Sequence, residues 1–411
     1  MTAAIDVPGD RAGNPTTPPR WRPDVQGLRA IAVLVVVLDH VGLAGFGGGF
    51  VGVDIFFVIS GYVITGMLLR DTDRGPGTWF LEFYAKRARR IVPAATLVIV
   101  LTVVATFELT NFLRGAQVLP DATAAALFVA NLHFIATGSD YARLGDDPSP
   151  LQHYWSLAVE EQFYLVWPLL VLLAVVLVRR VVRLRLPQVL VAVLTVVVVA
   201  SYAHSILLTS ADGTAAFYSP FTRAWELAIG ALLAATEPSL TQRLSAVGAV
   251  LLGWLGAAAI VWSVVFLDDT TSFPGWIAAV PVLGTAALIV SGMRVVRGSP
   301  SALLSTRTPG YIGEISYSLY LVHWPIFTIA AIRLDDSFSV VTQALLVATA
   351  FLGAVLMYHA FEDPIRRSRF LVTRPWLSLS IVPISIALVF AVAWFERYRW
   401  DLAVPLVQQL F

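Results

Sequence analysis

Arginine, histidine and carboxylate side chains stand inside otherwise apolar stretches of this sequence, where ionisable groups are costly and mark either functional sites or charge pairs. In the stretch 27–46, Arg29 and His40 have ten residues between them. Eleven helical steps of about 100° bring both side chains to within about 20° of one face, about 16 Å apart along the axis. This face offers a fixed cation near one end and a titratable imidazole deeper in, which can act as a general base. The alternative is a snorkelling arginine and a core histidine bonded to a backbone carbonyl.

Asp54 follows a glycine-rich turn at 45–52. A hairpin that turns near residue 48 places His40 and Asp54 at similar depth. Asp54 could then orient or charge-stabilise the imidazole, as carboxylates do for catalytic histidines. Alternatively, Asp54 caps the start of its helix.

The most polar entrance to any apolar stretch is the segment 152–168, QHYWSLAVEEQFYLVWP. Ser156, Glu160 and Tyr164 recur every four residues and share a helix face. The adjacent Glu160 and Glu161 diverge by about 100°, so only one of them faces a central site squarely. A solvated helix end is the alternative, but the deep apolar run that follows favours a functional role. The candidate binding residues here are His153, Trp155, Ser156, Glu161 and Tyr164, with Glu160 as a catalytic candidate.

Two further spans carry polar residues at helical spacing. Arg223 and Glu226 form an i, i+3 pair, which is a cheap way to hold two charges in lipid and favours a structural role. Ser316, Tyr320 and His323 form an i, i+4, i+7 stripe, and Trp324 and Pro325 follow it at an expected outer interface.

Arg87 and Arg90 lie one turn apart just before an apolar stretch. They either reflect the positive charge of cytoplasmic loops or dock a phosphorylated ligand. Their spacing does not separate the two interpretations.

The composition predicts a polytopic membrane protein. Of the 411 residues, 57% are hydrophobic and 13% are charged, with a mean hydropathy of +0.76, which excludes a disordered chain and argues against a soluble enzyme. A net charge of +1 gives no field for nucleic-acid binding. The absence of cysteine excludes disulfides, thiolate metal sites and cysteine nucleophiles. No metal site is predicted.

We expect an all-α fold of about ten transmembrane helices and an eleventh C-terminal span, since a span needs about 20 apolar residues. Residues 1–26 lack an apolar core, so no cleavable signal peptide is expected. The predicted spans are 27–46, 50–69, 91–110, 155–178, 188–209, 222–236, 246–267, 276–292, 313–333, 339–361 and 376–395.

Arginine-rich loops set the predicted orientation. Basic clusters at 11–22, 70–90, 179–185, 294–307 and 366–374 all fall on the cytoplasmic side only if the segment 117–137 does not cross the membrane. That segment is apolar but contains Asp121, Asn131 and His133, and we expect a re-entrant or interfacial segment. The N-terminus is then inside and the C-terminus outside.

Together these motifs resemble the acyltransferase-three family of bacterial integral-membrane O-acyltransferases. The matching stretches run in the family's order from about 27 to 367. They are GLRAIAVLVVVLDH (27–40), GGFVGVDIFFVISGYVIT (48–65), KRARRIVP (86–93), HYWSLAVEEQFYLVWP (153–168), RAWELAIGALLA (223–234), ISYSLYLVHWPI (315–326) and FEDPIRR (361–367).

The resemblance implies transfer of an acyl group, commonly acetyl, from cytoplasmic acyl-CoA to a carbohydrate or glycolipid hydroxyl outside the bacterial cytoplasmic membrane. Acyl-CoA is a donor substrate, and no tightly bound cofactor is implied. Arg29 and His40 match the family's essential pair, and His40 would be the general base or would carry the acyl group. The blocks that line or support the site contain Asp54, Arg87, Arg90, Glu160, Arg223, Glu226 and His323.

The expected organisation is a cytoplasmic tail (1–26), a membrane acyltransferase domain (27–367) and an extra span with a short outer tail (368–411). Some family members continue from such a span into an extracytoplasmic hydrolase-like (SGNH) domain. The main rival function is a proton-coupled transporter of a small solute, because intramembrane charges also build proton relays. An intramembrane serine protease that uses Ser60 is a weaker rival, since Val58 stands where its usual GxSG motif has a glycine. Neither the acceptor nor the oligomeric state follows from the sequence.

Overall fold

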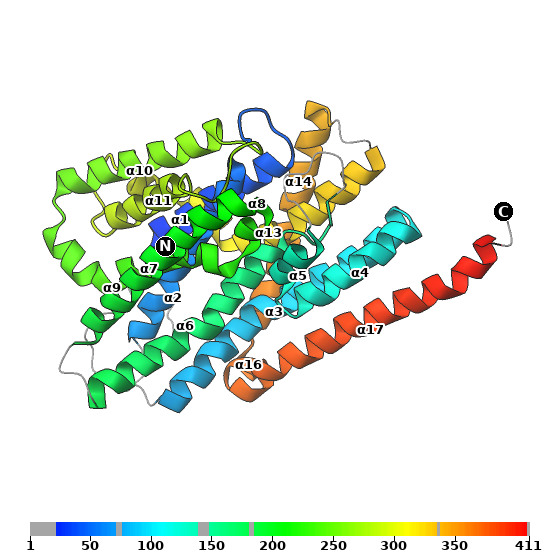
Figure 1. The fold of residues 1–411 in the computed structure, drawn as a ribbon, viewed down its shortest axis with the longest axis horizontal. Helices are drawn as coiled ribbons and strands as arrows, with labels where there is room; N and C mark the ends of the chain where they lie inside the picture. Colours follow the sequence, from blue (N-terminus) through cyan, green and yellow to red (C-terminus); the bar gives the residue numbers. More distant parts are fainter. Residues whose placement is uncertain (1–21, 71–75, 139–147, 181–184, 335–337, 409–411) are drawn as a thin grey trace, which may run out of the picture.

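The computed structural model describes residues 22–70, 76–138, 148–180, 185–334 and 338–408. Within these ranges every regular element is a helix, which confirms the predicted all-α membrane fold (Figure 1). Four basic residues of the predicted cytoplasmic clusters, Arg11, Arg20, Arg74 and Arg183, lie outside the described residues.

Each predicted span contains a helix. These helices are α1 (Pro23–His40), α2 (Gly52–Arg70), α3 (Pro76–Leu109), α6 (Tyr154–Arg180), α7 (Leu186–Ala211), α9 (Pro220–Arg243), α10 (Ala246–Phe266), α11 (Ala279–Gly292), α13 (Arg307–Leu334), α14 (Val340–Met357) and α17 (Pro375–Gln408). Eight of the described helices are long and apolar enough to cross a membrane: α2, α3, α6, α7, α10, α13, α14 and α17. Of the other three, α1 and α9 hold buried charges, and α11 has only 14 residues.

Several helix ends differ from the predicted spans by six residues or more, and two of them bear on the site. The first helix ends at His40 rather than 46, because Gly42 and Gly45 adopt φ values of 76° and 85°, which glycine tolerates and other residues rarely do. The third helix begins at Pro76 rather than 91. Trp79 and Phe83 on its first turns are buried in the apolar core, so the basic cluster Lys86–Arg90 lies within a helix and not in a loop.

The segment 117–137 forms parts of two short helices, α4 (Phe112–Ala126) and α5 (Ala130–Thr137). They are separated at Phe128, whose φ is 54°. With 15 and 8 residues, neither helix reaches the about 20 residues that a span requires. This break is the arrangement expected of a re-entrant or interfacial segment.

The central helices approach one another closely. A Cβ atom added to Gly61 of α2 would lie 1.8 Å from the carbonyl oxygen of Leu227 in α9, and one added to Gly230 would lie 1.9 Å from that of Val58. Glycine at both positions therefore lets the two backbones touch. The remaining short helices are η1 (Gly49–Val51), α8 (Gly213–Tyr218), α12 (Pro300–Leu304), η2 (Tyr358–Glu362), α15 (Asp363–Arg367) and α16 (Arg369–Val372).

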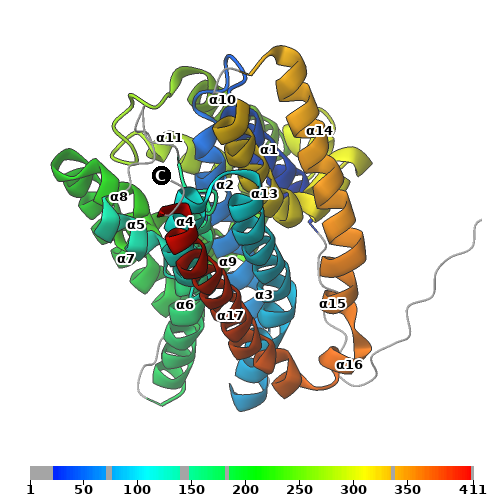
Figure 2. The ribbon, with the colours of Figure 1, turned by 90° about the vertical axis from the view of Figure 1, so that its right-hand side faces the viewer.

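The long last helix, α17, packs along α3 and α4 on one side of the bundle (Figures 1 and 2). Near one end, Arg89 of α3 donates to the Ser378 hydroxyl at 2.7 Å. Toward the other end, Arg399 pairs with Glu108 at 3.0 Å. Polar contacts at two widely separated levels thus fix α17 against α3.

Candidate active site

Two histidines from distant parts of the chain meet at the end of α1. Nδ1 of His40 lies 3.0 Å from Nε2 of His323 on α13, and Nδ1 of His323 lies 3.0 Å from the carbonyl oxygen of Leu319. In a neutral imidazole, the nitrogen that contacts a carbonyl oxygen must carry the hydrogen. His323 therefore accepts at Nε2, and His40 donates from Nδ1. The basic nitrogen of His40 is consequently Nε2, which is the form a general base needs.

A third histidine completes this cluster. The His153 ring lies 5.9 Å from that of His323, and its Nε2 contacts the carbonyl oxygen of Leu321 at 3.1 Å. Tyr320 holds the segment in place, because its hydroxyl donates to the His153 carbonyl at 3.0 Å and lies 2.5 Å from the Ser156 hydroxyl. The structure thus brings together three predicted stretches, on α1, at the start of α6 and on α13.

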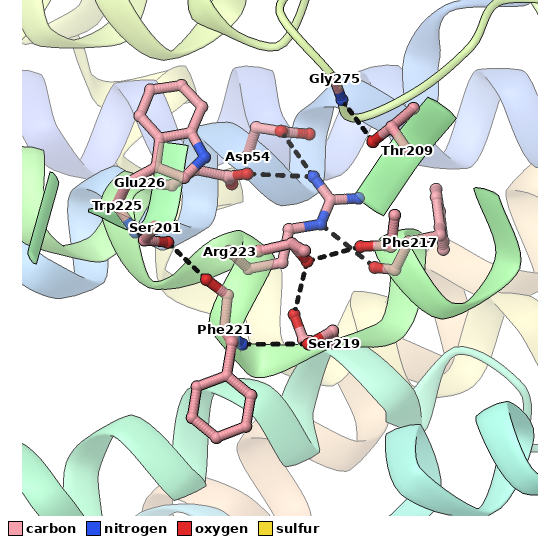
Figure 3. A network of polar contacts seen from close by, with 12 residues as sticks. Asp54, Ser201, Thr209, Phe217, Ser219, Phe221, Arg223, Trp225, Glu226 and Gly275 are labelled. Atoms are coloured by element: carbon pink, nitrogen blue, oxygen red, sulfur yellow. Dashed lines mark hydrogen bonds and ion pairs between the residues drawn. The ribbon is translucent and has the colours of Figure 1, made fainter. Parts of the chain in front are cut away.

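Asp54 has a different partner from the one expected. Its carboxylate lies 3.1 Å from Nη1 of Arg223, and the same guanidinium nitrogen lies 3.0 Å from Glu226 (Figure 3). Arg223 also donates from Nε to the carbonyl oxygen of Phe217 at 3.1 Å. The three charged side chains are at most 1% exposed. The predicted pairing of Arg223 with Glu226 is confirmed, whereas Asp54 is neither simply a helix cap nor the observed partner of His40.

The ion pairs of Arg223 join α2 to α9, about two helical turns from the close contact of Gly61 and Gly230. Trp155 and Phe217 stack around the guanidinium, at 5.5 and 5.0 Å from their ring centroids to its central carbon. Arg223 thus donates three hydrogen bonds, to two carboxylates and a carbonyl, and aromatic rings cover its guanidinium. This arrangement stabilises the bundle beside the histidine cluster. Trp155 packs against the Arg223 guanidinium there.

Glu160 lies at the centre of a second polar group. Ser60 of α2 and Tyr164 of α6 both donate their hydroxyl hydrogens to its carboxylate. The predicted shared face of Glu160 and Tyr164 is confirmed. Ser60 binds a carboxylate here, which does not provide the histidine base expected of a serine protease nucleophile.

The arginines that the sequence offers as ligand-binding candidates differ in their partners. Arg87 pairs with Glu161 at 2.6 Å, and its guanidinium covers the Tyr164 ring. Arg29 makes only a 3.3 Å contact with Gln26, and no hydrogen bond or ion pair of Arg90 is found within the described ranges. Arg29 and Arg90 therefore keep donors for a ligand. Arg87 donates to Glu161, and its buried Nε has no hydrogen-bond partner among the described residues. Glu160 and Glu161 diverge as predicted, since they bind different partners.

A surface pocket opens near Arg29, at the start of α1. Gln26 lines the pocket and accepts the hydrogen bond from Arg29. The other lining residues are Pro23, Ser305, Thr306, Arg307, Gly310, Tyr311 and Glu314. The remaining predicted stripe residue, Ser316, instead bonds locally to the carbonyl oxygen of Gly313 at 2.9 Å.

Sequence reasoning missed several buried polar contacts. Gln152 donates to the Tyr218 hydroxyl at 2.7 Å, and Gln162 donates to Asn131 at 2.8 Å, which fixes the re-entrant α5 to α6. Glu362, only 2% exposed, accepts from the Ser318 hydroxyl at 2.6 Å. A signal existed for Glu362, because a carboxylate directly follows the apolar span 339–361.

Comparison with known proteins agrees with this geometry. A family model described as an acyltransferase domain matches residues 22–359. The chain is 32% identical over 371 residues to the "Peptidoglycan O-acetyltransferase OatA" of Listeria monocytogenes, which covers 86% of this chain and 57% of the relative. It is 33% identical over 364 residues to the "Putative peptidoglycan O-acetyltransferase YrhL" of Bacillus subtilis, covering 85% and 56%.

A third relative is the "O-acetyltransferase OatA" of Staphylococcus aureus, 32% identical over 368 residues and covering 86% of this chain and 58% of the relative. The chain thus spans little more than half the length of these curated relatives. No solved structure matches significantly.

Proposed function

Because the chain belongs to the acyltransferase-domain family, we propose that it is an O-acyltransferase that moves an acyl group, commonly acetyl, from acyl-CoA to a carbohydrate hydroxyl. The observation that carries this proposal is the His40–His323 contact, because it places the hydrogen of the neutral His40 ring on Nδ1 and makes Nε2 the basic nitrogen. The names of the relatives point to peptidoglycan as the acceptor. The orientation expected from the basic clusters places the donor in the cytoplasm and the acceptor outside the bacterial cytoplasmic membrane.

In the direct mechanism, Nε2 of His40 takes the proton of the acceptor hydroxyl while the oxygen attacks the thioester carbonyl. The C–S bond then breaks, and the CoA thiolate recovers the proton from the imidazolium, which yields the ester and CoA–SH. The bond from His40 Nδ1 to His323 becomes charge-assisted in this step. In the alternative mechanism, Nε2 of His40 attacks the thioester carbonyl, the C–S bond breaks and the CoA thiolate leaves. The acceptor hydroxyl then displaces the acyl group from Nε2 to give the ester, and its proton goes to the thiolate to give CoA–SH.

Arg29 and Arg90 supply the donor side of the site. Their guanidinium donors are little used within the protein, and arginine binds phosphate oxygens in a bidentate fashion. The pocket lined by Gln26 gives the nucleotide part of acyl-CoA a route towards Arg29. The expectation that Arg87 shares this role is weakened by its Glu161 pair.

The test follows label from acetyl-CoA, carried in the acetyl group, into cell-envelope carbohydrate in membranes that hold the wild-type chain or His40→Ala at equal abundance. We expect His40-dependent label, with a loss of about 100-fold or more in His40→Ala, as for removal of a general base. Coupled solute uptake without transfer would instead support the transporter. CoA binding without transfer would show that the acceptor step needs a component beyond this chain.

Arg90→Gln tests the donor side separately. We expect the KM for acetyl-CoA to rise by about 10-fold or more, because a charge-assisted hydrogen bond contributes about 1.5–3 kcal/mol. The half-buried Arg114 on α4 provides the matched control, Arg114→Gln, which should leave the KM unchanged. An unchanged KM in folded Arg90→Gln would exclude this arginine from the donor site.

A further inference from the structure

Glu362 is a buried carboxylate in an unusual turn. It closes the π-helical turn η2 between α14 and α15, where the Asp363 N–H bonds to the Tyr358 carbonyl five residues back. Such π turns inside helices are frequent at functional sites. The side chain is 2% exposed and is held by the Ser318 hydroxyl of α13 at 2.6 Å.

The next residue has the same charge but the opposite environment. Asp363 binds Arg366 and Arg367 on its own helix, α15 (Figure 2), and its side chain is 21% exposed. Because successive helical residues point about 100° apart, one carboxylate faces the bundle and its neighbour faces away. Asp363 is therefore a matched control for Glu362.

Two of the three cations near Glu362 are the arginines of the proposed donor site. Arg90, Arg366 and Arg29 lie within Coulombic range of its carboxylate. Arg29 and Arg90 also lie within range of each other, where like charges repel. Neither forms an ion pair with Glu362 within 4.0 Å among the described residues. The carboxylate is thus a neighbouring counter-charge that leaves their donors open.

We propose that Glu362 is a positioning residue for the donor: it balances the Arg29–Arg90 charge while the site is empty and opposes retention of CoA after transfer. This inference rests on the proposed function. Two guanidinium groups in a low-dielectric interior need a nearby anion. Once the phosphates of CoA supply negative charge, Glu362 becomes a like charge beside them. Its presence therefore weakens anion binding and speeds product release.

The experiment measures the Kd of CoA, and of acetyl-pantetheine as the thioester without nucleotide phosphates, on the full chain in lipid nanodiscs. We expect Glu362→Gln to bind CoA about 10-fold more tightly, with acetyl-pantetheine unchanged and kcat lowered by slower CoA release. Asp363→Asn should match the wild-type chain in every value.

A second variant keeps the Glu362 carboxylate but removes its hydrogen bond from Ser318. Ser318→Ala removes the hydroxyl that holds the Glu362 carboxylate. The freed carboxylate then competes better with the CoA phosphates for Arg29 and Arg90, so CoA should bind about threefold more weakly. Unchanged or weaker CoA binding in Glu362→Gln would overturn the inference and leave the proposed function intact. If Glu362→Gln does not fold, wild-type affinity for CoA in Ser318→Ala would overturn it in the same way. Failure of the wild-type chain to bind CoA would overturn both.

Discussion

Replacing His323 tests whether it acts on the reaction through His40. The wild-type contact joins two neutral rings, and a neutral hydrogen bond contributes about 0.5–1.5 kcal/mol. When His40 becomes an imidazolium the bond gains charge, and its contribution rises to about 1.5–3 kcal/mol. Because kcat depends on the difference between these two contributions, about 1–1.5 kcal/mol, and about 1.4 kcal/mol corresponds to a factor of ten in rate, loss of the acceptor should lower kcat by about 5- to 13-fold.

Two variants separate the hydrogen bond from the shape of the ring. His323→Phe keeps an aromatic side chain beside Phe327 but removes the acceptor. His323→Gln places an amide oxygen near the original Nε2 and should recover part of the activity. The measurement is the initial rate of labelled acetyl transfer at saturating acetyl-CoA, with protein amounts matched.

The double variant gives the sharpest result. If His323 works only through His40, then His40→Ala/His323→Phe should be no slower than His40→Ala alone, because the two residues act as one unit. Wild-type kcat in His323→Phe would refute the reasoning. Equal activity of the Phe and Gln variants would assign His323 a packing role instead.

Two further predictions concern the bundle. Arg223→Met should lower the free energy of unfolding by about 3–5 kcal/mol, because it leaves two carboxylates buried without a cation. Thermal unfolding in detergent should show that adding Asp54→Asn and Glu226→Gln restores part of the lost stability. Gly61→Ala should destabilise by about 1–3 kcal/mol through overpacking against α9, whereas Gly310→Ala, with no atom within 4 Å of its added Cβ, should have the wild-type melting temperature.

The sequence predicts the helices well because their apolar stretches are long, and it predicts local pairs such as Arg223 with Glu226 because helical spacing alone brings them together. It does not determine contacts between helices. His40 and His323 are 283 positions apart, and the partner of Asp54 lies 169 positions away. Their meeting depends on how α1, α2, α9 and α13 pack, and that depends partly on glycines whose effect appears only when two backbones touch.

The partner of Asp54 was misjudged for a related reason. A hairpin does bring α2 back beside α1, but depth in the membrane does not fix the direction of a side chain. Arg223 is a permanent cation on the helix in closest contact with α2, so an Asp54 that faced elsewhere would leave it buried with less compensation. The demand for charge balance thus outweighs proximity in the chain.

The same demand bears on the contact between His40 and His323. A carboxylate beside His40 would carry its charge throughout the catalytic cycle and would need its own buried cation. A neutral His323 needs none, and its orientation is fixed by the Leu319 carbonyl. His323 stabilises the imidazolium less than a carboxylate would, but it adds no permanent charge of its own beside His40. The fold therefore uses permanent ion pairs to hold its helices, and a pair of histidines lies where we propose that a proton moves.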